Sequence, residues 1–387
     1  GAALLGLLVV GPLLVGALLR LRVKQFGQVW LGILGHQEQQ LVERLERAVA
    51  LWRQRGAVAD DCINPAVKDE LIKRIHLDCG QMTFHGTYAN LFINGTFKTY
   101  YNVCERPDIE FFQDYYGGEA WEYWKPPRQK PVDQSYWNGL RDFVKAATND
   151  PALYKNFAFV DARVDLASFA DYLLVCTYSA VQDWPGHNYV MSRPIMPGGK
   201  YRFYSWDNGS GFNASKVTND HFAEKVLLAS QWTSSAPVTI LFSFLKRSPE
   251  GRLFFADRIN KHFFHGGALS DQNVSNRFAA LREVVRPMVF YQQKSFNNDV
   301  ETKWIPQRRA AIFRDYVAQG IWPTNIIPPE FSQHGGWVSN GFPVAIVLRA
   351  KGQTTRTTAE AHRRVPGAAG RHMERARQFW RRLAFAC

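Results

Sequence analysis

The sequence predicts an α+β fold, with short hairpins in its first half and helices in its second half. Asn94-Gly95 lies between two runs of apolar and aromatic residues, and this dipeptide is the strongest short hairpin signal. Residues 188–192 and 200–205 are predicted strands on either side of a Pro-Gly-Gly turn. Residues 236–320 repeat apolar side chains at helical spacing. Hydrophobic residues make up 46% of the 387 residues, which is ample for a packed core.

The formal net charge of +13 is concentrated at the C-terminal end of the chain. Residues 349–387 contain ten Lys or Arg against two acidic residues and are rich in Ala and Gly. This composition is typical of a disordered basic tail. The remaining positive charge is small for the length of the chain. Nucleic-acid binding would therefore depend on the tail alone, and no nucleic-acid partner is expected.

The five cysteines are spaced irregularly, without a Cys-x-x-Cys pair, so neither a disulfide framework nor a zinc site is predicted. Cys176 lies on the apolar face of a predicted helix and is expected to be a buried thiol. His262 and His265 are three residues apart, but no third ligand is close in sequence. Surface or capping roles are therefore favoured over a metal pair for these histidines.

Residues 1–19 contain no charged residue, and Arg20, Arg22 and Lys24 follow them. A run of this length is just sufficient to cross a bilayer, and its basic flank would set the orientation. A signal peptide would carry its basic residues before the apolar run. Two interpretations of residues 1–25 stay open. One is a membrane-spanning or secretory segment, and the other is an apolar stretch at the end of a fragment.

Two helices are predicted before the first hairpin. Residues 37–58, within an unassigned segment 26–61, have the pattern of an amphipathic helix. A second helix is expected after Asn64-Pro65, a capping residue with proline in the first turn. Its inward-facing side chains are Val67, Leu71, Ile72 and Ile75.

Residues 160–213 are the part of the chain around which the rest is organised. Asp165 is a good N-cap for a helix whose apolar residues recur at three- and four-residue spacing. This helix is expected to end near Gln182, because Pro185 and Gly186 cannot continue it. A polar loop, a strand, a hairpin turn and a second strand follow.

Two polar motifs stand at the ends of these elements. Asp183 and Asn188 are five residues apart in the loop, and Asp207 follows the second strand within Trp206-Asp-Asn-Gly209. In phosphoryl transfer to a hydroxyl, one Asp accepts the proton and an Asn five residues later holds a divalent ion. A second Asp holds the metal against the nucleotide phosphates. The same spacing is also typical of a turn that satisfies its own backbone, so both interpretations stay open.

Several further motifs accompany these residues in a fixed order. They are Leu91-Phe-Ile-Asn-Gly-Thr-Phe97, Tyr100 to Glu105, Gln182 to Val190, Tyr204 to Phe212, Ala236 to Leu241, Phe254 to Arg258, Gly320 to Pro323 and Pro329 to Val338. Together, over about residues 62–346, they resemble the CotH kinase family, the spore-coat-type atypical protein kinases. The resemblance implies an atypical protein-kinase-like fold with two lobes.

The resemblance also assigns roles to individual residues. It implies that Asp183 is the catalytic base and that Asn188 and Asp207 hold Mg²⁺ or Mn²⁺. It further implies that Glu105 and Lys125 border the ATP site. For these two residues a structural interpretation also stays open, namely a strand-end acid that caps a turn and an exposed strand-end lysine.

Two features depart from the family pattern. Residues 26–61 do not resemble the strand-rich part of the family's N-terminal lobe, so this lobe is expected to be truncated or altered. Asn208 and Gly209 stand where the family has a second acid, so a supplementary metal ligand is expected to be absent. The predicted kinase-like domain covers 62–327. A Gly/Pro-rich linker or the start of a β module follows at 328–348, and then the basic tail begins.

The predicted function is metal-dependent transfer of the γ-phosphate of ATP to a Ser or Thr hydroxyl of a protein, with a coat or surface protein as the substrate. The alternative is a non-catalytic spore-coat or cell-envelope protein that uses the same fold for binding. Either function favours the cell envelope, secretion or a membrane anchor over the cytoplasm. Any membrane contact would go through residues 1–19.

Overall fold

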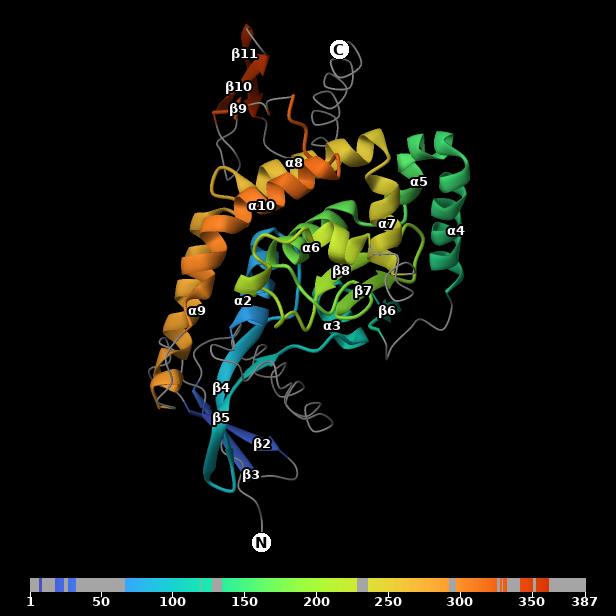
Figure 1. Cartoon of the computed structure of the whole chain (residues 1–387). Coiled ribbons are helices and arrows are strands. Elements are labelled where there is room, and N and C mark those ends of the chain that lie inside the picture. The colour runs from blue at the N-terminus through green and yellow to red at the C-terminus, as the bar shows by residue number, and fades with distance from the viewer. Residues whose placement is uncertain are drawn as a thin grey trace. The chain divides into compact units, whose positions relative to one another are not determined.

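The chain forms two compact units, residues 1–322 and 323–387, in a computed structural model (Figure 1). The structure describes residues 7–8, 18–23, 27–32, 67–118, 120–126, 134–227, 236–291, 297–325, 328, 330–332, 342–350 and 353–361. In the described part of the first unit, helices are combined with small antiparallel sheets, so the predicted α+β class is confirmed. No helix among the described residues is long and apolar enough to cross a membrane.

The helices of the first unit contribute many of the buried residues of its main core. They are α2 (Lys68–Asp78), α3 (Ile109–Tyr116), α4 (Ser135–Asn149), α5 (Phe157–Asp161), α6 (Leu166–Ser179), α7 (Pro237–Leu245), α8 (Pro249–Phe263), α9 (Asp271–Tyr291) and α10 (Ile305–Ala318). Helices α7 to α10 lie within the region whose apolar repeats predict helix, so that prediction is confirmed.

The strands of the first unit form small sheets. β4 (Gly86–Ile93) and β5 (Thr96–Cys104) make the hairpin predicted at Asn94-Gly95, and β1 (Leu7–Leu8) pairs with β4. β2 (Leu18–Val23) pairs with β3 (Gly27–Gly32). A further sheet has the order β6-β7-β8, with the bounds Trp121–Trp124, Tyr189–Pro194 and Arg202–Ser205. The functional motifs flank β7 and β8.

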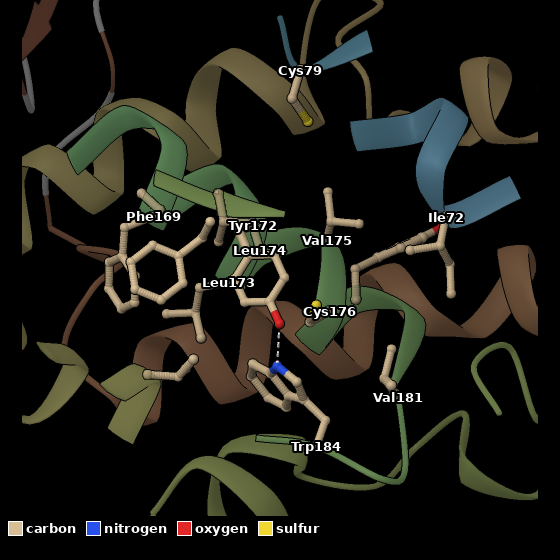
Figure 2. Close-up of a cluster of buried hydrophobic side chains, with 14 of the residues drawn as sticks. Ile72, Cys79, Phe169, Tyr172, Leu173, Leu174, Val175, Cys176, Val181 and Trp184 are labelled. Atoms are coloured by element: carbon tan, nitrogen blue, oxygen red, sulfur yellow. Dashed lines mark hydrogen bonds between the residues drawn. The ribbon is translucent and has the colours of Figure 1, made fainter. Parts of the chain in front are cut away.

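Helix α6 occupies the centre of the main core and packs against α2, α8, α10 and β8 (Figure 1). Almost every one of its residues is buried, because apolar and small side chains occur on all of its faces. Cys176 is 0% exposed, which confirms its predicted burial, and burial raises the pKa of its thiol. Figure 2 shows the one polar link drawn in this cluster, in which Trp184 Nε1 donates a hydrogen bond to Tyr172 Oη at 2.7 Å.

Both ends of α6 are defined by caps, a side-chain cap at the N-terminus and a backbone cap at the C-terminus. Asp165 Oδ1 accepts a hydrogen bond from Ser168 N at 3.1 Å, which confirms the predicted N-cap. The helix ends at Ser179 and not near Gln182, because Ala180 adopts the left-handed conformation with a φ of 50°. The stop is therefore set three residues earlier by a C-cap, before Pro185 acts.

The buried guanidinium of Arg308, on α10, satisfies the carbonyl groups at the end of α6. It donates hydrogen bonds to Thr177 O at 2.6 Å and Tyr178 O at 2.9 Å. It also donates to Val217 O and Asn219 O, each at 3.0 Å, in the loop that follows the Asp207 motif. One side chain thus connects α10, the end of α6 and this loop.

Several sequence predictions differ from the structure near the ends of the chain. α2 has Val67 as its N-cap, so the helix begins later than Asn64-Pro65 predicts, although its four predicted inward residues are all buried. Residues 7–8 and 18–23 are strands, and so are residues 27–32, whereas the predicted helix 37–58 lies outside the described residues. The rest of the predicted segment 1–25 lies outside them as well.

The second unit contains a small antiparallel sheet. The prediction of a disordered tail over residues 349–387 is wrong for the residues that lie in this sheet. β10 (Phe342–Ala350) pairs with β9 (Glu330–Phe331) and with β11 (Gln353–Ala361). Residues 353–361 lie in the segment predicted to be disordered, but they contain two pairs of adjacent threonines, and threonine favours strands. The remainder of the tail lies outside the described residues.

Replacement of Arg308 by Met should lower the free energy of unfolding by about 3 kcal/mol or more, because buried carbonyl groups lose their donor. Urea unfolding followed by circular dichroism measures the change. The matched control is Arg286→Met, whose side chain is 73% exposed and should shift stability by less than about 0.5 kcal/mol. Equal stability of the two variants would contradict the assigned role of Arg308.

Candidate active site

The turn after β8 carries the predicted metal ligand Asp207. Its φ of 56° is a left-handed conformation that costs a non-glycine residue about 1–2 kcal/mol. Asn188, directly before β7, has a φ of 53°, and its Nδ2 donates a hydrogen bond to Asp207 O at 3.0 Å. Because this bond uses the donor atom of the amide, Oδ1 of Asn188 is the atom that can bind a cation. The structure thus brings two predicted ligands together.

Asp183 lies in the loop between α6 and β7, and its neighbours are fixed on both sides. Gln182 N donates a hydrogen bond to Ser210 Oγ at 3.1 Å, which attaches this loop to the residues after Asp207. Trp184 is anchored in the core by the bond shown in Figure 2. Asp183 itself is exposed. A carboxylate held at the surface by a fixed loop is accessible to a hydroxyl group of another protein.

Lys125 follows β6 and is partly buried, so the alternative of an exposed strand-end lysine is wrong. Its Nζ lies 3.7 Å from the centre of the Trp206 ring, in a cation–π contact next to Asp207. Burial and the nearby Arg106 lower the pKa of Lys125 to about 8, while Cys104 and Asp207 oppose this shift. The lysine is still mostly protonated at neutral pH and places a positive charge beside the Asp207 turn.

Glu105 takes part in a buried network at the end of β5. Its carboxylate accepts hydrogen bonds from His85 N at 2.9 Å and from Tyr115 Oη at 2.8 Å, and it lies 3.0 Å from His85 Nδ1. Burial alone would raise the pKa of Glu105, but the hydrogen bonds from His85 and Tyr115 outweigh it and lower the pKa. The neighbouring residues in the chain, Cys104 and Arg106, influence the pKa of Lys125. The end of β5 therefore lies close to Lys125. A nucleotide contact of Glu105 stays a prediction.

An acid–lysine pair on α2 also belongs to the site, and the sequence analysis missed it. Asp69 Oδ1 accepts a hydrogen bond from Asn208 N at 2.7 Å, and its Oδ2 lies 2.5 Å from Lys73 Nζ. Lys73 Nζ lies 5.6 Å from the centre of the Trp206 ring. The one signal for this pair in the sequence is the spacing of an acid and a lysine four residues apart on one helix.

Asn208, which stands where the family has a second acid, is buried next to Asp207. Its side chain is 0% exposed, and neither polar atom of its amide has a hydrogen-bond partner among the described residues. No three His, Cys, Asp or Glu side chains in the described part of the chain form a metal-binding group. Asp207 and Asn188 nevertheless offer oxygen atoms, the donors that Mg²⁺ and Mn²⁺ prefer. This donor set fits an ion that is also bound by nucleotide phosphates.

His262 is buried, so its predicted surface or capping role is wrong. Its Nε2 lies 2.8 Å from Asp171 Oδ1, in the middle of α6. Arg258 binds the same carboxylate with Nε and Nη2, and Gln81 Nε2 donates to it at 2.7 Å. Because Asp171 is 0% exposed and fully paired, this cluster joins α8 to α6 and has a structural role.

Asp315 of α10 lies near the loop after the Asp207 turn, which the neighbouring Arg314 contacts through a hydrogen bond from Nη2 to Thr218 O at 2.8 Å. The side chain of Asp315 is 1% exposed, and its Oδ2 has no hydrogen-bond partner among the described residues. Burial and the nearby carboxylate of Asp220 raise the pKa of Asp315 to about 6, although Arg314 and Arg308 oppose the shift. This carboxyl group is therefore a titratable element close to the proposed site.

The fold and the site define an α+β protein in which an Asn and an Asp meet near a lysine, with an exposed Asp on the adjoining loop. The family model described as CotH kinase protein matches residues 55–319, more than half of the chain. The chain belongs to the CotH kinase family. No curated protein matches the chain.

Replacement of Asp315 by Asn should stabilise the protein above pH 6 and have little effect below pH 4. The native pKa of Asp315 lies above its unfolded value of 3.8, so its carboxyl group favours the native state when protonated, and this contribution is lost as the pH rises through about 6. The gain at pH 8 should be on the order of 1–3 kcal/mol.

Urea unfolding of the Asp315 variant and the wild type between pH 4 and 8 measures this difference. Asp142→Asn is the control, because its side chain is 62% exposed and its change should stay within about 0.5 kcal/mol at every pH. A gain that does not depend on pH would contradict the raised pKa.

Proposed function

We propose that the chain is a metal-dependent protein kinase that transfers the γ-phosphate of ATP to a Ser or Thr hydroxyl of a protein. The observation that carries the proposal is the junction of Asn188 and Asp207, with Lys125 beside it and Asp183 exposed on the adjoining loop. These residue types, in this order, match the layout used for phosphoryl transfer to a hydroxyl.

Each residue has a separate task in the proposed reaction. Asp183 accepts the proton of the attacking hydroxyl and orients its oxygen toward the phosphorus atom. Asn188 Oδ1 and the Asp207 carboxylate would hold Mg²⁺ or Mn²⁺. The bound ion supplies neutralisation of the charge on the phosphate oxygens. Lys125 attracts the phosphates as a positive charge in a partly desolvated position.

Family membership supports a second candidate, a non-catalytic spore-coat or envelope protein on the same fold. The observation that favours it is Asn208, whose buried amide replaces an expected acid. A scaffold of this kind has no reason to bind nucleotide, so a shift of the melting temperature by Mg²⁺ and ATP distinguishes the candidates. For either function we propose an envelope, secreted or membrane-anchored location and a coat or surface protein as partner. A nucleic-acid partner is not proposed.

Two single substitutions should separate binding from chemistry. Asp207→Ala should abolish saturable, metal-dependent ATP binding, because the only carboxylate of the proposed metal site is removed. Asp183→Asn should retain ATP binding and lower kcat by about 10²- to 10⁴-fold, because general-base catalysis is lost. Calorimetry with ATP and either Mg²⁺ or Mn²⁺ measures binding, and transfer of labelled phosphate to protein measures turnover.

The control for both variants is Glu283→Gln on α9, whose side chain is 56% exposed. It should bind and react like the wild type. Absence of ATP binding to the wild-type chain with either metal would reject the kinase proposal, and unchanged binding by the Asp207 variant would reject its ligand role.

A further inference from the structure

The conformation of Asp207 requires support from its surroundings. Its left-handed φ of 56° is unfavourable for a residue with a side chain. The hydrogen bond from Asn188 fixes the carbonyl group of Asp207. Contacts with the two neighbouring residues, Trp206 and Asn208, fix how the chain enters and leaves Asp207.

Both neighbours are contacted from one helix, α2. Asp69 Oδ1 accepts a hydrogen bond from the backbone N–H of Asn208 at 2.7 Å. Lys73, one turn later, lies under the ring of Trp206 at 5.6 Å and is bound to Oδ2 of Asp69 at 2.5 Å. A single carboxylate thus joins a backbone donor after Asp207 to a lysine that contacts the residue before it.

This pair is shielded from water and fixed in place. The side chain of Lys73 is 1% exposed and that of Asp69 is 13% exposed, so each depends on the other for charge compensation. Burial alone lowers the pKa of Lys73, but Asp69, with help from Cys104 and Glu70, outweighs it and raises the pKa. Trp206 is held on another side by the edge of Phe84, with 5.5 Å between ring centres.

Helix α2 is itself anchored at its far end. Arg277 Nε donates to Asp78 Oδ2 at 2.7 Å, and Asn273 Nδ2 donates to the same oxygen at 3.0 Å, which ties α2 to α9. The apolar face of α2 is buried in the main core. The position of Asp69 relative to the turn is therefore set by packing along the whole helix.

We propose that Asp69 and Lys73 act as a clamp that holds the Asp207 turn, in which Asp69 is the positioning residue for the carboxylate of Asp207 and Lys73 is its charge partner. The effect on metal binding rests on the proposed function, whereas the effect on the turn does not. Partners that orient a ligand without touching the metal typically change metal affinity by about 10- to 100-fold.

The test uses two double variants of the full chain. Both contain Lys73→Met, so that neither leaves a buried lysine unpaired. Asp69→Asn keeps an oxygen that can accept the Asn208 N–H, and Asp69→Ala does not. Amide hydrogen exchange of residues 206–209, read by mass spectrometry, and calorimetry with Mn²⁺ and ATP are measured for each.

The clamp predicts faster exchange of residues 206–209 and about 10- to 100-fold weaker Mn²⁺·ATP binding for the Ala variant only. Glu283→Gln on α9 is the control, because its side chain is 56% exposed and both quantities should stay as in the wild type. Equal exchange in the Asn and Ala variants would overturn the clamp. If the wild type binds no Mn²⁺·ATP, the proposed function fails, and exchange alone decides for or against the clamp.

A second variant covers failure of the Ala variant to fold. Asp69→Glu keeps the charge for Lys73 but extends the carboxylate by one methylene, which moves the acceptor away from Asn208 N. The clamp predicts faster exchange at residues 206–209 in this variant as well. Exchange equal to that of the wild type would overturn it.

Discussion

The buried guanidinium of Arg308 is the interaction on which the proposed site most depends. The last carbonyl groups of a helix lack partners within the helix, and burial without a donor would cost each of them about 1–3 kcal/mol. Arg308 supplies a donor to Tyr178 O, adds a second donor to Thr177 O beside Ala180 N, and donates to two carbonyls in the loop after the Asp207 turn. The central helix can therefore end inside the core, and the chain can turn back directly into the Asp183 loop.

The geometry of the site is determined mainly by the backbone. Asn188 and Asp207 both have left-handed φ values, and each lies at the end of a strand of the β6-β7-β8 sheet. The sheet fixes where the strands end, and the contact of Asn188 Nδ2 with Asp207 O fixes how the two turns meet. The two turns thereby set the positions of the polar side chains that they carry. Helix α2 supports the Asp207 turn from outside the sheet, through the hydrogen bond between Asn208 N and Asp69 Oδ1.

The local features of the fold could be predicted from the sequence, because they depend on neighbouring residues. The Asp165 cap, the Asn94-Gly95 hairpin and the buried face of α2 are of this kind, and the order of Asp183, Asn188 and Asp207 identified the candidate site. The stop of α6 at Ser179 could not be predicted, since it depends on Arg308, which lies more than a hundred residues away in the sequence.

The same limit explains the residues that the sequence analysis missed or misjudged. Asp69 contacts Asn208 across 139 positions, and Asp171 pairs with His262 across 91, so no local pattern reveals either contact. In the sequence, an Asp and a Lys four residues apart on a helix are typical of a solvent-exposed helix face. Only the structure shows that Asp69 contacts Asn208. Tertiary packing decides which polar groups are buried. The periodicity of a sequence indicates burial only for apolar residues.

The electrostatics of the site favour an anion next to Lys125. A lowered pKa means that its surroundings disfavour the charged form, even with the Trp206 ring at 3.7 Å and Asp207 nearby. A phosphate group at this position would reverse that balance, since an opposite charge in a partly desolvated place stabilises the ammonium ion. The proposed metal site offers one carboxylate and one amide, which bind a bare divalent ion weakly. Metal and nucleotide phosphates would therefore complete each other's binding in the proposed site, next to the positive charge of Lys125.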